Sequence, residues 1–388
     1  MKLAAPFEFA TAQKISFGAG RLREIGALAQ TFGRSALVVT GRNIARADQL
    51  RELLRVANIA TTIFSVPGEP TVDDIGRGVA AARGAEADLV IAFGGGSPID
   101  AGKAIAAMLT NPGALEDYLE VVGRGQTLTA PPVPLIAAPT TAGTGAEVTR
   151  NAVLGATAHR LKVSLRSPLL LPRLALIDPE LTYSLPRQET AWSGMDALTQ
   201  LIEAFVCTRA NAMTDALCRE ALPRAARALP LAFQNPNDAS ARSEMCLASL
   251  FSGFALANAG LGAVHGFAAP IGGMFSAPHG AVCACLLPHV MEQNIRALRV
   301  DSAESPALER YSEIASFLTG RRGAPPEAAV DWVRSLSAGL DIPALGKFQI
   351  GREAIPELVE RSLKSSSMKG NPISLSAHQL SEALARAL

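Results

Sequence analysis

Long apolar runs and an excess of either charge are both absent from this sequence. No uninterrupted apolar stretch reaches the roughly 18 residues that a membrane span needs, and the N-terminal segment lacks the continuous apolar core of a secretory signal. The formal net charge is +1, without a basic stripe or an acidic tail. This balance argues against nucleic acid or an anionic membrane surface as a partner. We therefore expect a cytoplasmic protein.

Cysteine is scarce, and its pattern argues against a disulfide framework. The five cysteines form an odd, unclustered set, which is more typical of buried thiols in a reducing compartment: Cys207, Cys218, Cys246, Cys283 and Cys285. Cys283 and Cys285 are one residue apart and could bind a metal. Their alternation with small apolar residues in AVCACLL favours a packed apolar segment instead.

The first half of the chain alternates between strand-like and helix-like stretches. A chain of 388 residues is too long for one core and predicts two domains. Helical patterns run from Ile44 to Ala57 and from Val72 to Arg83. Apolar strands are predicted at Ser35–Thr40, Thr61–Ser65, Ala87–Phe93 and Pro134–Ala138. Alternation of this kind predicts a parallel sheet with helices on both faces.

The second half, from about residue 184, has helical periods and hardly any β-branched runs. Helices are predicted over 197–206, 213–226 and 241–257, with Ser240 as the N-cap of the third. The sequence therefore predicts an α/β dinucleotide-binding domain over residues 1–183 and an all-helical metal and substrate domain over 184–388. We find no internal repeat and no low-complexity tract.

A glycine-rich loop follows the predicted strand at 87–93 and reads GGGSPIDAGK from Gly94 to Lys103. Glycines let backbone N–H groups approach a ligand, and the start of a helix attracts phosphate. The loop is not a Walker A motif, because Ala104 follows Lys103. It is not a Gly-x-Gly-x-x-Gly fingerprint either, because Ile99 stands at the last glycine position. A tight turn without a ligand is the alternative interpretation.

Histidine is also scarce, with five in the chain, and two of them stand in a suggestive pattern. Asp196 and Gln200 are one helical turn apart, and His265 and His279 flank a segment rich in glycine and proline. A carboxylate and two imidazoles can hold a divalent metal with one position left open, as catalytic zinc and iron(II) sites do. The alternative is a buried carboxylate with two ordinary histidines.

Four motifs in order make the chain resemble the iron-containing (group III) alcohol dehydrogenases. GGGSPIDAGKA resembles the family's GGGSxxDxAK motif, and PTTAGTGAEVT resembles its PTTAGTGSEVT. GMDALTQLIEAFV and VHGFAAPIGGMFSAPHGAVCACLLPHVMEQN resemble its two metal-binding segments. The resemblance extends from FGAGRL near the N-terminus to NPISLSAHQL near the end, so it covers essentially the whole chain.

This resemblance implies an enzyme that interconverts an alcohol and an aldehyde or ketone by hydride transfer to or from NAD(P), assisted by a divalent metal, and a homodimer. Asp196, His265 and His279 would be catalytic and, with Gln200, would hold the metal. It also implies cofactor-binding residues: Gly95, Gly96 and Ser97 at the pyrophosphate, Thr140, Thr141 and Thr144 at the nicotinamide and ribose, and Asp100 and Lys162 nearby.

The chain departs from the family's pattern at two positions. Gln200 replaces the histidine that is the second metal ligand, and Ala269 replaces a histidine associated with proton relay. An amide oxygen is a poorer ligand for iron or zinc than imidazole. We therefore expect a weaker site in which Zn²⁺ is as plausible as Fe²⁺. A metal-free site is the rival, as in related maleylacetate reductases, and there His265 or His279 would donate the proton.

The residue after the predicted strand SALVVT bears on whether the cofactor is NAD(H) or NADP(H). Relatives that prefer NAD carry an aspartate there, whereas this chain has Gly41 followed by Arg42. Loss of the carboxylate removes repulsion of a 2′-phosphate, and an arginine could pair with it. We therefore favour NADP(H), with the alternative that Gly41 is a turn residue and Arg42 is solvated.

Three other functions stay open at this stage. A maleylacetate-reductase-like enzyme usually lacks the first metal aspartate, which is intact here as Asp196. A lyase of the dehydroquinate synthase type shares the architecture but needs a strongly basic phosphate pocket. A cofactor-binding protein whose catalysis has decayed would explain Gln200 and Ala269.

Overall fold

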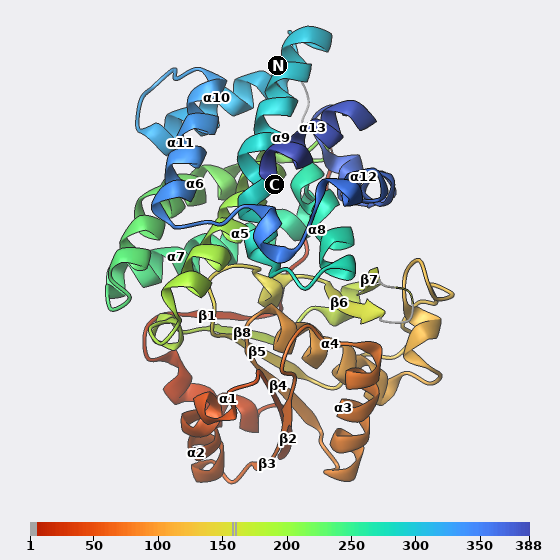
Figure 1. Cartoon of the computed structure of the whole chain (residues 1–388). Helices are drawn as coiled ribbons and strands as arrows, with labels where there is room; N and C mark the ends of the chain where they lie inside the picture. Colours follow the sequence, from red (N-terminus) through yellow and green to blue (C-terminus); the bar gives the residue numbers. More distant parts are fainter. Residues whose placement is uncertain (1–5, 157–158, 160) are drawn as a thin grey trace. The chain divides into compact units, whose positions relative to one another are not determined.

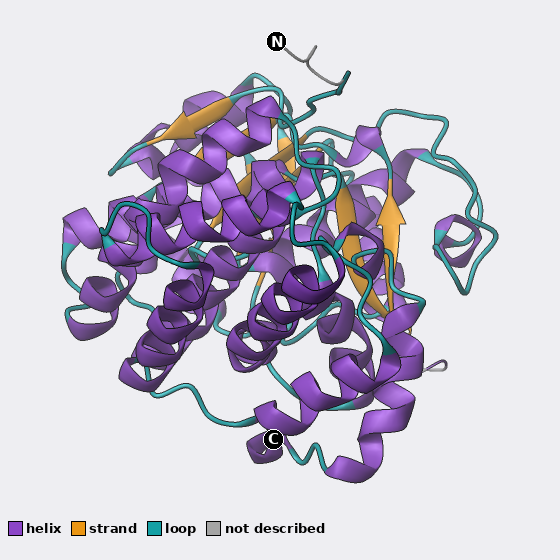
Figure 2. Cartoon of the chain, turned by 90° about the horizontal axis from the view of Figure 1, so that it is seen from above, coloured by secondary structure: helices purple, strands orange, loops and turns teal. Residues whose placement is uncertain are grey.

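The computed structural model describes residues 6–156, 159 and 161–388. These residues form two compact units. One unit comprises Ala10–Tyr183, and the other comprises Ser184–Leu388 together with the segment that ends at Phe9. All strands of the described residues lie in the first unit, and the second consists of helices and loops (Figure 2).

The first unit is built on a six-stranded parallel sheet with the order β1-β8-β5-β4-β2-β3. Its strands are β1 Ile15–Phe17, β2 Ser35–Thr40, β3 Ala60–Ser65, β4 Leu89–Gly94, β5 Leu135–Pro139 and β8 Leu174–Ile177. The predicted parallel α/β fold is therefore confirmed. All six residues of β4 are buried, as expected for a strand covered on both faces.

Helices cover both faces of this sheet (Figure 1). In β2, Leu37 and Val39 belong to the core shared with α3 (Val72–Gly84) and α4 (Gly96–Thr110). Their neighbours Ala36 and Val38 belong to the core shared with α1 (Ile25–Gln30) and α2 (Asp48–Val56). Two separate cores result because successive residues of a strand point to opposite faces.

A small antiparallel pair lies outside this sheet. Strand β6 (Asn151–Ala156) pairs with β7 (Leu161–Arg166), and Asn151 lies opposite Arg166. Ala152 and Leu154 of β6 and Val163 and Leu165 of β7 are buried in the core that α4 shares. This pair therefore packs on the helix that follows the glycine-rich loop.

The described residues of the second unit form nine α-helices, besides short 3-10 turns: α5 Arg187–Val206, α6 Ala212–Gln234, α7 Ala239–Asn258, α8 Ala263–Met274, α9 His279–Asp301, α10 Pro306–Thr319, α11 Pro326–Gly339, α12 Ile355–Leu363 and α13 Ala377–Ala387. The predicted N-cap of α7 is wrong. Asp238, not Ser240, caps this helix, because its Oδ1 accepts from the backbone N–H of Ala241 at 2.9 Å. No single helix among the described residues is long and apolar enough to cross a membrane. Helices α7 and α8 reach that length and hydrophobicity only when they are taken together, and they are bent by 94° relative to each other.

Candidate active site

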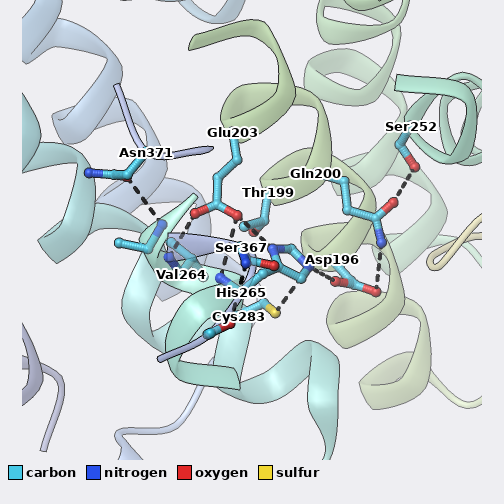
Figure 3. A network of polar contacts seen from close by, with 12 residues as sticks. Asp196, Thr199, Gln200, Glu203, Ser252, Val264, His265, Cys283, Ser367 and Asn371 are labelled. Carbon is cyan, nitrogen blue, oxygen red and sulfur yellow. Dashed lines mark hydrogen bonds and ion pairs between the residues drawn. The ribbon is translucent and has the colours of Figure 1, made fainter. Parts of the chain in front are cut away.

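One face of α5 carries the acidic part of the site. Asp196, Gln200 and Glu203 are separated by three and four residues, so they lie along one side of the helix (Figure 3). All three are buried, with 1%, 2% and 5% of their surface exposed. A buried run of two acids and an amide is costly unless each side chain has polar partners.

Helices α8 and α9 bring two imidazoles and a thiol to Asp196. Its Oδ1 lies 3.3 Å from Nε2 of His265 and 3.5 Å from Nε2 of His279. Cys283, one turn after His279 on α9, places its Sγ 3.7 Å from each of these nitrogens. The four ligand atoms all lie within 4.8 Å of one another. Figure 3 shows His265 and Cys283 pointing toward Asp196.

Glu203 orients the ring of His265 through Nδ1, the nitrogen that does not face Asp196. Its Oε2 lies 2.6 Å from Nδ1 of His265, and its Oε1 accepts from the backbone N–H of Val264 at 2.7 Å. A carboxylate at Nδ1 holds a proton there, so Nε2, which faces Asp196 and Cys283, is the nitrogen available to a metal. Asn371 holds the start of the same helix by accepting from the backbone N–H of Ala263 at 3.1 Å.

Gln200 is anchored by both ends of its amide. Its Oε1 accepts from Ser252 Oγ at 2.8 Å, and its Nε2 donates to Asp196 Oδ2 at 3.4 Å. The amide nitrogen, not the oxygen, therefore faces the carboxylate. Gln200 therefore contacts Oδ2 of Asp196, while the two histidines lie at Oδ1.

The charges of the cluster perturb one another. Burial lowers the pKa of His265, but Cys283, Asp196 and Glu203 outweigh it, and the pKa of His265 lies well above its usual value. Burial raises the pKa of the Cys283 thiol, but the two histidines outweigh it and the net shift is downward. The pKa of Asp196 is likewise lowered by His279 and His265 against the effect of burial. Such a set titrates as a unit.

The donor set fits a divalent metal. Carboxylate, imidazole and thiolate are all zinc ligands, and the first two also suit iron(II). Sequence reasoning identified Asp196, His265 and His279, and the structure brings them together. Sequence reasoning favoured a packed apolar segment for Cys283. The residue is buried, as that interpretation requires, but its thiol lies at the two imidazoles. Glu203 was also missed, although its spacing of seven residues from Asp196 on one helix was a usable signal.

The glycine-rich loop lies in the other unit, between β4 and α4. Gly95 precedes the first helical residue Gly96, so the backbone N–H groups of Gly96 and Ser97 lie at the helix start, where anions bind. A Cβ on Gly95 would lie 3.2 Å from the Thr141 side chain, and a Cβ on Gly96 would lie 3.0 Å from that of Thr144. Glycine therefore allows this loop to approach the segment after β5.

The remaining predicted cofactor residues lie in the same unit as this loop. Thr140 is buried, and its backbone N–H donates to Gly94 at 2.9 Å. Asp100 on α4 accepts from the backbone N–H of Val153 at 3.0 Å. Lys162 on β7 pairs with Glu69.

The two strands that precede Gly41 and Gly95 flank the point where the sheet order reverses. The chain passes from β3 back across β2 to β4, so β2 and β4 are neighbours. Ligands of such sheets bind at the carboxyl ends of the strands at this switch point. Gly41 follows β2, and a Cβ there would lie 4.0 Å from Pro98 in the first turn of α4. Arg42 beside it is exposed.

Fold and site together define a class: dehydrogenases with an α/β nucleotide-binding unit and a helical metal-binding unit. The chain belongs to the iron-containing alcohol dehydrogenase family. The family profile "Iron-containing alcohol dehydrogenase" matches residues 12–179, and "Fe-containing alcohol dehydrogenase family, C-terminal" matches residues 190–388. Enzymes of this family use a nicotinamide dinucleotide and a divalent metal. The chain is accordingly an NAD(P)-dependent oxidoreductase that interconverts an alcohol and an aldehyde or ketone by hydride transfer.

Three relatives illustrate the similarity. The chain is 35% identical over 369 residues to 1,3-propanediol dehydrogenase of Klebsiella pneumoniae, covering 92% of each chain. It is 35% identical over 370 residues to lactaldehyde reductase of Escherichia coli, covering 92% of this chain and 93% of that one. A solved structure of sulfoacetaldehyde reductase from Bifidobacterium kashiwanohense in complex with NAD⁺ matches with a TM-score of 0.87 at 28% identity, covering 98% of each chain.

Proposed function

We propose that the chain reduces a short-chain aldehyde that carries a second polar group, or oxidises the matching alcohol, at a metal centre held by Asp196, His265 and His279. The convergence of these three side chains from α5, α8 and α9 carries the proposal. The substrate class follows the names of the relatives, whose substrates are a diol, a hydroxyaldehyde and a sulfonated aldehyde. Ala269, one turn after His265 on α8, has a smaller side chain than the histidine that the family's pattern carries there.

A divalent metal in this cluster supplies Lewis acidity that stabilises negative charge on a substrate oxygen. The protein's own part is to hold the cluster in place. Glu203 keeps the proton of His265 on Nδ1, so that Nε2 stays a lone-pair donor. Gln200 fixes Oδ2 of Asp196, so that Oδ1 faces the two imidazoles. The burial of Asp196 and His265 excludes water and strengthens each of these interactions.

The test is steady-state kinetics of metal-reconstituted enzyme with lactaldehyde, 3-hydroxypropanal and propanal. We expect Asp196→Asn to lower kcat/KM about a thousandfold, because Lewis-acid stabilisation contributes several kcal/mol. Asp238→Asn is the control, because asparagine caps a helix as well as aspartate does. Equal activity of Asp196→Asn and wild type would refute the proposed centre, and a preference for propanal would refute the substrate class.

We also propose that the cofactor is NADP(H), bound with its pyrophosphate at Gly95, Gly96 and Ser97. The support is the position of Gly41 and exposed Arg42 directly after β2, at the switch point. Because Gly41 replaces the aspartate, the repulsion that its carboxylate would exert on a 2′-phosphate is absent. Arg42 can donate two hydrogen bonds to that phosphate.

Arg42→Ala separates this proposal from NAD(H) use. We expect kcat/KM for NADPH to fall about 10–100-fold, the value of a charge-assisted contact, and kcat/KM for NADH to stay within about twofold. Arg51→Ala is the matched control, because Arg51 is an exposed arginine of the next helix and pairs with Asp48. A wild-type preference for NADH would overturn the proposal.

A further inference from the structure

The thiol of Cys283 has the position of a metal ligand. His279 and Cys283 are four residues apart on α9, so both side chains leave the same face of the helix. The Sγ atom is buried and lies equally far, 3.7 Å, from Nε2 of His265 and Nε2 of His279. With Asp196 Oδ1, these atoms form a compact four-atom cluster within the helical unit.

The spacing of the four atoms agrees with a tetrahedral zinc site. Bonds of about 2.0–2.1 Å to nitrogen or oxygen and about 2.3 Å to sulfur separate oxygen from nitrogen by about 3.4 Å and sulfur from nitrogen by about 3.6 Å. The oxygen–nitrogen separations in the cluster are 3.3 and 3.5 Å, and both sulfur–nitrogen separations are 3.7 Å. These four of the six separations are within about 0.1–0.2 Å of the tetrahedral values, and all four atoms lie within 4.8 Å of one another.

Gln200 is not oriented to fill the fourth place. Its oxygen accepts from Ser252 at 2.8 Å, and its nitrogen, which has no lone pair to offer a metal, faces Asp196 at 3.4 Å. The departure from the family's histidine at this position therefore leaves the cluster one strong donor short. Cys283 is the side chain that supplies a further donor at the two imidazoles.

We propose that Cys283 is a thiolate ligand of the metal and that the centre is an Asp196–His265–His279–Cys283 site that favours zinc over iron. The inference rests on the metal centre of the proposed function and adds a fourth protein ligand to it, so the substrate oxygen enters as a fifth ligand, an expansion that catalytic zinc sites permit. Two anionic ligands balance the charge of a divalent ion, which a buried site requires. A soft thiolate favours zinc over metals that prefer oxygen and imidazole donors.

Cobalt(II) is the probe that distinguishes the ligand sets. Apoprotein of the full chain is titrated with Co²⁺, and the absorption spectrum is recorded. A thiolate ligand gives a sulfur-to-cobalt charge-transfer band in the near ultraviolet, whereas oxygen and nitrogen ligands give only the weaker visible bands. We expect the wild type to show the band, and zinc-edge absorption of the zinc-loaded protein to show a sulfur neighbour at about 2.3 Å.

Cys283→Ser and Cys285→Ser form the matched pair. Cys285 is on the same helix, and its thiol donates to the carbonyl of Pro343 at 2.7 Å. We expect Cys283→Ser to lose the charge-transfer band and to bind Co²⁺ at least about tenfold more weakly, with the visible bands and the circular dichroism of the fold retained. We expect Cys285→Ser to keep the band.

The outcomes separate the inference from the function on which it rests. Visible cobalt bands without a charge-transfer band in the wild type overturn the role of Cys283 and leave the centre of Asp196, His265 and His279 intact. A band that survives in Cys283→Ser overturns the role of Cys283 as well. Failure of the wild type to bind Co²⁺ or Zn²⁺ at all overturns the metal-assisted function itself.

Discussion

At the residue scale, the geometry of the cluster depends on side chains that do not belong to it. Glu203 contacts the outer nitrogen of His265 and the backbone N–H of Val264, so one buried carboxylate fixes both the ring and the start of α8. Outer partners of this kind change metal affinity about 10–100-fold when they are removed. Glu203 is therefore a positioning residue of the site.

Glu203→Gln tests this role. The amide cannot accept at both Val264 and His265 as strongly as a carboxylate, so the tautomer of His265 is less well fixed. We expect zinc affinity, measured by competition with a chelator, to fall about 10–100-fold. Leu380→Ala is the control: it opens a cavity at a fully buried position of α13 and lowers stability without changing the affinity. Equal affinities for the two variants would show that Glu203 acts only through stability.

Two buried ionisable groups of the α/β unit, Glu147 and Lys103, make stability depend on pH. Burial raises the pKa of Glu147 to about 7, and burial lowers the pKa of Lys103 to about 8. Lys103 Nζ donates to Thr149 Oγ1 and to the carbonyl of Asn151, both at 2.8 Å. These contacts satisfy two of the three ammonium protons in a site that water does not reach.

Glu147→Gln isolates the contribution of the acidic group to this pH dependence. Between about pH 4.5 and 7 the unfolded chain has released the Glu147 proton while the folded chain keeps it, so the free energy of unfolding falls as pH rises. Relative to Glu147→Gln, we expect the wild type to lose about 2–3 kcal/mol across this range. Urea unfolding at several pH values measures it, with exposed Glu116→Gln as control. Parallel curves for wild type and Glu147→Gln would contradict the expectation.

The candidate site was only partly readable from the sequence. Asp196, His265 and His279 could be identified because few side chains other than carboxylates and imidazoles bind such metals. Cys283 was not identified, because its small apolar neighbours favoured a packed segment, although its spacing of four residues from His279 on one helix was a usable signal. The orientation of the Gln200 amide could not be predicted either, because it depends on a hydrogen bond from Ser252 on α7, 52 residues later in the chain.

At the element scale, the strands that could be predicted are those with continuous apolar runs. Strands β2 to β5 lie where the pattern placed them, within one or two residues at each end. Strands β1 and β8 have three and four residues, too few to show a period. They join the sheet because β5 offers a free edge to β8, which in turn pairs with β1. The cap of α7 was misplaced by two residues because Asp238 and Ser240 both suit that position.

Two glycines inside helices of the α/β unit predict opposite effects of alanine. Gly102 of α4 packs on β4, and a Cβ there would lie 2.7 Å from Cβ of Ala92. Gly76 of α3 is exposed, with no heavy atom within 4 Å of its added Cβ. We expect Gly102→Ala to cost about 1–3 kcal/mol by overpacking and Gly76→Ala to gain about 0.5–1 kcal/mol from helix propensity. Urea unfolding followed by circular dichroism measures both. A neutral Gly102→Ala would show that α4 can move away from the sheet.

At the scale of the whole molecule, the side-chain cluster and the glycine-rich loop belong to different units. The cluster of Asp196, His265, His279 and Cys283 lies entirely in the helical unit, and the glycine-rich loop lies in the α/β unit. Both tryptophans, Trp192 and Trp332, are also in the helical unit. Tryptophan fluorescence therefore follows the unfolding of the unit that holds the cluster.

Metal binding should stabilise that unit by mass action. At a free zinc concentration of about 100 times the dissociation constant, the folded state gains about 2.7 kcal/mol. We expect the urea midpoint of the tryptophan signal to rise accordingly in the wild type, and to fall back when a chelator removes the zinc. Asp196→Asn should abolish the rise, because it removes an anionic donor that both imidazoles face, whereas Asp238→Asn should keep it. A zinc-dependent rise that persists in Asp196→Asn would mean that zinc stabilises this unit from somewhere other than the cluster.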